Sequence, residues 1–99
     1  MAGGEAGDAA GAADAFAELL HDKVRVQGWD HYSTLDTWHC LAHWRGKAGD
    51  AVRAANAYAK LLDGQSRVLG PDHPDILTTR RNLAYWGRKA WDAAADVGQ

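Results

Sequence analysis

The sequence predicts an all-α protein, an antiparallel helix-turn-helix repeat of the solenoid kind with about four helices and a short C-terminal capping helix. The stretch that begins at Ala6 recurs from Ala48 and starts again at Ala90, a spacing of 42 residues each time. Half of the aligned positions in the copies 6–47 and 48–89 are identical. Within each copy, apolar residues recur at the three- and four-residue spacing of one helix face, and no alternating strand pattern appears in the sequence.

The first helix is expected to follow a flexible N-terminal lead, residues 1–7. Asp8 is a suitable N-cap, because its carboxylate can accept hydrogen bonds from free amides of the first turn. Gly28 suits the left-handed end of a helix, because glycine has no Cβ. The apolar positions between these two residues fall on one helical stripe: Ala9, Ala12, Ala13, Phe16, Leu19, Leu20 and Val24.

The second helix is expected to begin after a loop at residues 29–32. Ser33 is a suitable cap for it, and the glycine-containing stretch 46–49 predicts a turn after Arg45. The positions expected to face the core are Leu35, Trp38, Leu41 and Ala42.

The second copy predicts two more helices with their own caps. Asp50 is expected to cap the third helix, and Asp75 the fourth, which should end near Arg88. Residues 90–97 form a partial third copy, expected to be a short helix that covers the end of the stack. A single repeat domain is therefore predicted over residues 8–97.

The second long loop and the helix after it resemble a known family. Residues 70–75 read Gly-Pro-Asp-His-Pro-Asp, and Leu-Thr-Thr-Arg (77–80) and Asn-Leu-Ala (82–84) follow. These motifs resemble the 42-residue class of tetratricopeptide repeats, of the kinesin-light-chain type, and the resemblance extends over residues 6–97. It implies that the helix after each such loop lines the concave groove of a superhelix, where peptides or partner proteins bind, and that the repeats have no catalytic chemistry. Since the chain starts on the second helix of a repeat, we interpret it as an excised or engineered segment.

Composition narrows the functional classes. The net charge is −2 and no basic run occurs, which argues against a nucleic-acid partner. No apolar stretch reaches the roughly 20 residues of a membrane span. The single cysteine, Cys40, cannot form an internal disulfide and fits a reducing compartment, so we expect a cytoplasmic protein. No cofactor is predicted.

The two copies differ most in the first loop and the second helix, while the core positions are kept. We predict that the changed surface binds a partner protein or peptide. Its expected contact residues are Trp29, Tyr32, Asp36, His39 and His43, with Trp38 and Cys40 at the margin. Trp29 and Tyr32 are the expected anchors, because aromatic side chains dominate interface energetics. The alternative for these two rings is that they fold back onto the helix ends.

Other readings of this surface are weaker. His39 and His43 are four residues apart and share a helix face with Asp36, but the ligand set for a tetrahedral metal is incomplete, so no metal is predicted. Cys40 and a histidine could form a nucleophile–base pair, but no third orienting group or oxyanion hole is evident, so no enzymatic activity is predicted.

The alternative function is structural. The open ends of a two-copy stack expose apolar surface, so the segment could form a homo-oligomer by end-to-end stacking or helix exchange.

Overall fold

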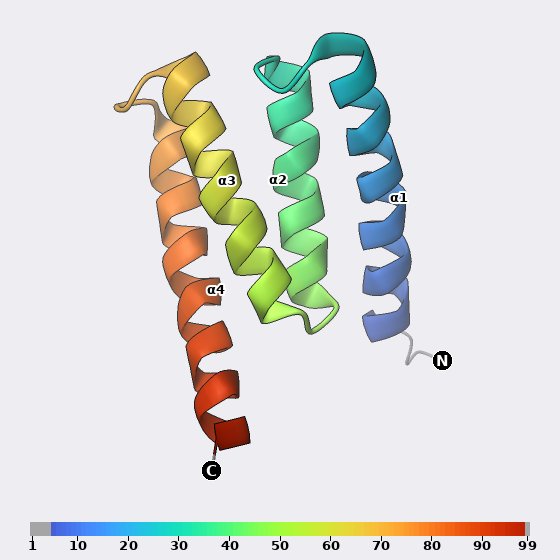
Figure 1. Ribbon diagram of the computed structural model, residues 1–99, viewed down its shortest axis with the longest axis vertical. Helices are drawn as coiled ribbons and strands as arrows, with labels where there is room; N and C mark the ends of the chain where they lie inside the picture. The colour runs from blue at the N-terminus through green and yellow to red at the C-terminus, as the bar shows by residue number, and fades with distance from the viewer. Residues whose placement is uncertain (1–4, 99) are drawn as a thin grey trace.

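The described residues form four antiparallel helices arranged in a row (Figure 1). The computed structural model describes residues 5–98, and side-chain surroundings for residues 8–94. The helices are α1 Glu5–Gln27, α2 Tyr32–Lys47, α3 Ala51–Leu69 and α4 Pro74–Gly98. Each helix packs mainly on its neighbours in sequence, so α1 and α4 form the two edges of the row. The described residues contain no strand, and the predicted all-α fold is confirmed.

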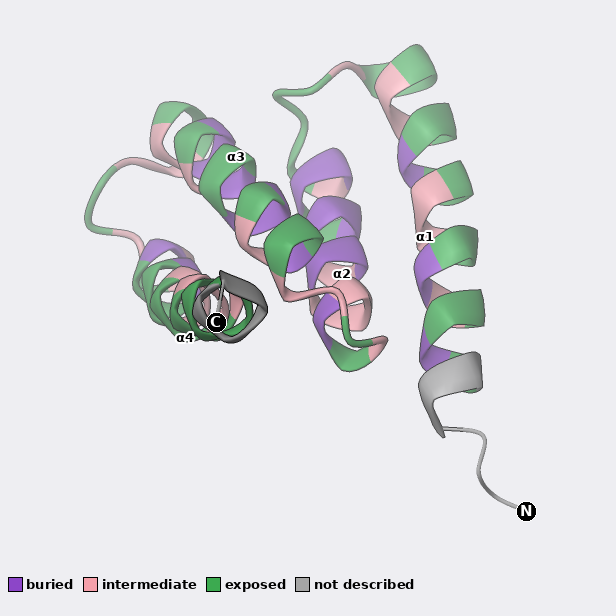
Figure 2. Ribbon diagram, turned by 60° about the horizontal axis from the view of Figure 1, so that its bottom comes forward, coloured by how far each residue is buried: buried purple, intermediate pink, exposed green. Residues whose placement is uncertain are grey.

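The core lies where α1, α2 and α3 meet (Figure 2). Leu35 and Ala42 of α2 are buried against Tyr58 and Leu61 of α3, and α1 adds Leu20 from the other side. Two tryptophans at equivalent positions of the copies, Trp44 and Trp86, also pack against this cluster. The helix α2 is therefore the central element, since it is covered on two sides.

Histidines cap the two helices that follow the long loops. Nδ1 of His31 accepts a hydrogen bond from the backbone N–H of Ser33 at 3.1 Å, and Nδ1 of His73 accepts one from Asp75 at 3.1 Å. The predicted caps, Ser33 and Asp75, are wrong by two residues. The imidazole nitrogens of the histidines accept the hydrogen bond from a free backbone N–H that a hydroxyl or carboxylate oxygen usually accepts at an N-cap.

The start of α1 differs from the prediction. The helix begins at Glu5, so Asp8 lies inside it and is not its N-cap. Of the expected flexible lead, residues 1–4 lie outside the described residues. The repeat counterpart of Asp8 behaves as predicted: Asp50 caps α3 and accepts a hydrogen bond from the backbone N–H of Arg53 at 3.0 Å.

The predicted short capping helix is wrong, because α4 runs unbroken to Gly98 (Figure 1). Gly49 shows the reason. It has a φ of 93° in the turn between α2 and α3, a conformation that costs little only for glycine. The same place in the next copy holds Trp91, so the turn is not repeated and the helix continues. Trp91 is 74% exposed, so it does not cover the end of the stack as expected.

Candidate functional site

A groove of about 230 Å³ lies between the first halves of α2 and α4, over the end of α3. We call it the α2–α4 groove. Its lining residues are Tyr32, Leu35, Asp36, His39, Gln65, Leu69, Asp75, Thr78 and Thr79. It thus brings together three of the seven residues expected to bind a partner, namely Tyr32, Asp36 and His39.

Buried contacts fix the floor of this groove. Leu35 is 2% exposed and packs so closely on α3 that a Cβ on Gly64 would lie 3.0 Å from its Cδ2 atom. The Thr79 hydroxyl donates a hydrogen bond to Oε1 of Gln65 at 2.6 Å, and both side chains are buried. Side chains of three helices therefore form the floor of the groove.

The groove offers an aromatic ring and two carboxylates to a ligand. Tyr32 is 55% exposed at the start of α2, Asp36 follows one turn later, and Asp75 lines the opposite side on α4. His39 has Nε2 3.4 Å from Nδ2 of Asn82, and its ring meets that of Tyr58 edge-on at a centroid distance of 5.7 Å. Carboxylates on both walls favour a ligand with positive charge.

His43 lies on the same helix as the groove residues but does not line the groove. Its ring meets Trp44 edge-on, with centroids 5.1 Å apart. Partial burial, then the charges of Lys47 and His39, lower the pKa of His43. This histidine is therefore held toward its neutral form, in which it can both donate and accept a hydrogen bond.

Cys40 is half-buried and its surroundings do not activate it. Burial, and then the charge of Asp36, raise the pKa of the thiol, whereas a nucleophilic cysteine needs a lowered pKa. Burial also raises the pKa of the neighbouring Tyr58 to about 12. In the part of the chain that the structure describes, no three histidine, cysteine or acidic side chains are placed to hold a metal ion.

Trp29 and Trp38 lie in a different hollow, which shares no lining residue with the α2–α4 groove. Their ring centroids are 4.6 Å apart with the planes tilted by 56°. Trp38 is 9% exposed and Trp29 46%, so Trp29 covers the core tryptophan and also reaches the surface. Trp29 therefore packs on the ring of Trp38 in α2, and the two expected anchors, Trp29 and Tyr32, line different hollows.

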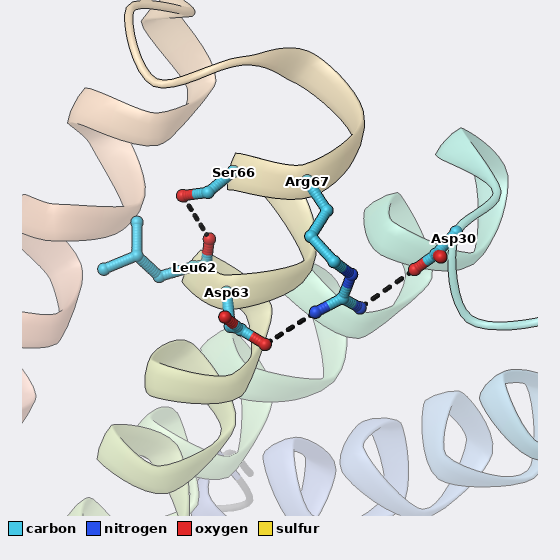
Figure 3. A network of polar contacts seen from close by, with 5 residues as sticks. All are labelled: Asp30, Leu62, Asp63, Ser66 and Arg67. Carbon is cyan, nitrogen blue, oxygen red and sulfur yellow. Dashed lines mark hydrogen bonds and ion pairs between the residues drawn. The ribbon is translucent and has the colours of Figure 1, made fainter.

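A polar network that the sequence reasoning missed fixes the first long loop to α3 (Figure 3). Arg67 donates a hydrogen bond from Nη2 to Oδ1 of Asp30 at 2.9 Å and from Nη1 to Oδ2 of Asp63 at 2.6 Å. These two carboxylates raise the pKa of Arg67. The signal was present in the sequence, because Arg67 and Asp30 both occupy positions that are identical in the two copies.

The row of antiparallel helices, each packed on its neighbours in sequence, defines an all-α helical-repeat protein. The family model described as tetratricopeptide repeat matches residues 33–98, and the chain belongs to this family. Members of the family generally act as protein–protein interaction modules. No curated protein and no solved structure is significantly similar to the chain. Among the described residues, no helix has the length and apolar character needed to cross a membrane.

Proposed function

We propose that the chain binds a peptide, or an extended segment of a partner protein, in the α2–α4 groove. One observation carries the proposal: Tyr32, Asp36 and His39, which all differ from their counterparts in the second copy, line the same groove. His43 and Cys40 extend this surface along α2. Trp29 and Trp38 belong to its outer margin, in the neighbouring hollow.

The ligand of this groove is a segment that carries lysine or arginine next to an apolar or aromatic side chain. Asp36 and Asp75 would pair with its cation, and a charge-assisted hydrogen bond to a carboxylate is stronger than a neutral one. Tyr32 would stack on the apolar side chain while its hydroxyl remains in water.

A selection experiment tests the proposal. A library of short displayed peptides is selected on the immobilised chain, and the dissociation constants of the enriched peptides are measured by calorimetry. We expect enrichment of cationic peptides whose binding weakens in the Asp36→Asn variant. Enrichment of acidic peptides would show that the α2–α4 groove is not the binding site. Enrichment of peptides whose affinity is unchanged in the Asp36→Asn variant would show the same.

A second candidate function is association of the chain with itself by end-to-end stacking. The observation that favours it is that Leu77 and Ala84 of α4 are exposed, whereas their counterparts in the first copy are buried in a helix junction. This surface is separate from the α2–α4 groove, so the two functions do not exclude each other.

We also propose that the chain functions in the cytoplasm and belongs to the kinesin-light-chain class of the family. The first proposal is supported by the single cysteine, and the second by the 42-residue spacing and the loop at 70–75.

A further inference from the structure

The outer face of α4 is exposed where the equivalent face of α2 is buried. Leu77 is 51% exposed and Ala84 is also exposed. Their counterparts one copy earlier, Leu35 and Ala42, are 2% and 0% exposed, because α3 packs on them. The α4 helix therefore presents the surface on which a helix like α3 would sit.

The outer face of α1 presents the other half of such a junction. Ala15 is exposed and Leu19 is 42% exposed. Their counterparts on α3, Ala57 and Leu61, are 4% and 0% exposed in the core cluster that α3 shares with α2. Because α1 and α4 are the two edges of the row, these two surfaces lie on opposite sides of the molecule (Figure 1). The outer face of α4 resembles the α2 side of the α2–α3 contact, and the outer face of α1 resembles the α3 side.

The two outer faces carry opposite charges. The exposed acidic residues of α1 include Asp14, Glu18 and Asp22, and the exposed basic residues of α4 include Arg80, Arg81 and Arg88, with Asp92 as an exposed acidic residue nearer its end. Arg25 engages Asp22 at 3.1 Å within α1. Complementary charge of this kind selects and orients one partner surface.

The repeat equivalence also sets a register between the two faces. In the chain, Trp38 of α2 and Lys60 of α3 line the same hollow. Arg80 stands at the position of Trp38 in the next copy, and Glu18 stands at the position of Lys60 in the previous one. If α1 of a second molecule sat on α4 as α3 sits on α2, Arg80 of one molecule would face Glu18 of the other.

We propose that the acidic outer face of α1 docks on the basic outer face of α4 of a second molecule of this protein. In this contact Arg80 of one molecule pairs with Glu18 of the other. The inference rests on the second candidate function above and uses none of the residues that line the α2–α4 groove. The contact joins two different surfaces, so each dimer keeps one unused face at each end. Association therefore continues beyond the dimer.

Two substitutions between the copies weaken this junction relative to the one inside the chain. Arg88 stands at the position of Gly46, where a Cβ would overlap the indole ring of Trp86 on α4, so Arg88 would crowd the α2 helix of a second molecule that docks on α4. Asp22 stands at the position of Gly64, another place of close helix approach. The second molecule therefore sits further from α4 than α3 does from α2. Charge then contributes more to the contact between molecules than apolar packing.

Sedimentation equilibrium of the full chain tests this inference. We expect the average mass to rise with concentration past that of a dimer at about 25 mM salt, and to fall toward the monomer at about 500 mM salt, because salt screens exposed charges. Arg80→Glu and Glu18→Arg should each weaken the association at least about tenfold. The double variant Arg80→Glu/Glu18→Arg should restore it to within about threefold of the parent, because the pair is complementary again.

Three results would overturn the inference: a monomer at every concentration in low salt, a mass that stops rising at the dimer, or a double variant as weak as the single ones. The groove variant Tyr32→Ala is the control and should associate like the parent. Conversely, Arg80→Glu should bind a selected groove peptide with unchanged affinity. The two proposals can therefore fail independently.

Discussion

At the scale of single residues, the two aromatic side chains that replace loop prolines of the second copy have different surroundings. Trp29 packs on Trp38 beside the loop that Arg67 fixes to α3. Tyr32 points its ring to the rim of the α2–α4 groove and is 55% exposed. The first is thus mainly a packing residue, and the second is the better candidate for a binding anchor.

For Tyr32→Ala we expect binding of a selected groove peptide to weaken by about 2 kcal/mol, as for a hot-spot aromatic residue. The melting temperature should stay unchanged, because the ring is more than half exposed. The matched control is Tyr85→Ala: Tyr85 is 54% exposed and does not line the groove, so its removal should leave affinity unchanged. Equal effects of the two substitutions on calorimetric affinity would contradict this assignment.

For Trp29→Ala we expect a loss of about 1–2 kcal/mol in the free energy of unfolding, measured by urea denaturation, because the contact with Trp38 is lost. This is less than the roughly 3–5 kcal/mol of a fully buried tryptophan, since Trp29 is partly exposed. Trp91→Ala, at a position 74% exposed, should cost less than about 0.5 kcal/mol. A Trp29 variant as stable as the parent would show that the stacking contact contributes nothing.

His43 should make stability depend on pH. Its pKa in the folded chain is lowered from the ordinary value of 6.5, so the unfolded chain binds more protons at mildly acidic pH. The free energy of unfolding is therefore highest above the ordinary histidine pKa of 6.5, and it decreases as the pH falls below that pKa toward the lower pKa of the folded chain. Urea denaturation at several pH values should show this loss, and His43→Gln should flatten the curve. A curve with the same slope in the variant would assign the effect to other groups.

At the scale of helices, a single glycine decides how closely α2 and α4 approach. Gly46 is buried and faces the ring of Trp86, so the α2 backbone itself forms part of the packing surface. Gly87, also within a helix, has open space where a Cβ would be. The two glycines therefore test packing and helix propensity separately.

Gly46→Ala should lower the free energy of unfolding by about 1–3 kcal/mol, as expected for overpacking, although alanine favours helix formation. Gly87→Ala should instead raise it by about 0.5–1 kcal/mol, because only the propensity changes. Denaturation curves of the two variants give the comparison. Stabilisation by both substitutions would mean that Trp86 moves aside without cost.

At the scale of the whole molecule, stability is distributed unevenly along the row of helices. The helix α2 is covered by both α1 and α3, whereas α4 is covered mainly by α3 (Figure 2). Residues 91–94 of α4 are all exposed. The end of α4 thus depends on its own hydrogen bonds, while α2 depends on tertiary packing.

Amide hydrogen exchange should follow this distribution. We expect the amides of residues 91–94 to exchange at least about a hundredfold faster than those around Leu41 and Ala42 in α2, because local opening near a helix end needs no disruption of the core. Mass spectrometry of peptides from the two segments measures the ratio. Similar protection in both segments would indicate a contact that covers the end of α4, either within one molecule or with a second molecule. A dilution series would separate these two cases, because only the contact with a second molecule depends on concentration.

Repetition and apolar spacing in the sequence determined the helices, their order and the main core positions. These features depend on short-range physics, because a helix face is set by residue spacing and a turn by a glycine such as Gly28 or Gly49. The continuity of α4 could also have been predicted, since Trp91 replaces the glycine that the turn requires. The caps of α2 and α4 were missed because histidine is an unusual capping residue.

The tertiary structure alone decided how the changed residues of the first copy divide between surfaces. Helix periodicity placed Asp36 and His39 on one arc, but it could not show that α4 closes a groove over them. Nor could it show that the ring of Trp29 folds onto Trp38 or that Asp30 reaches Arg67. Those contacts join segments far apart in the sequence, or depend on a loop path, and they form only once the helices have packed.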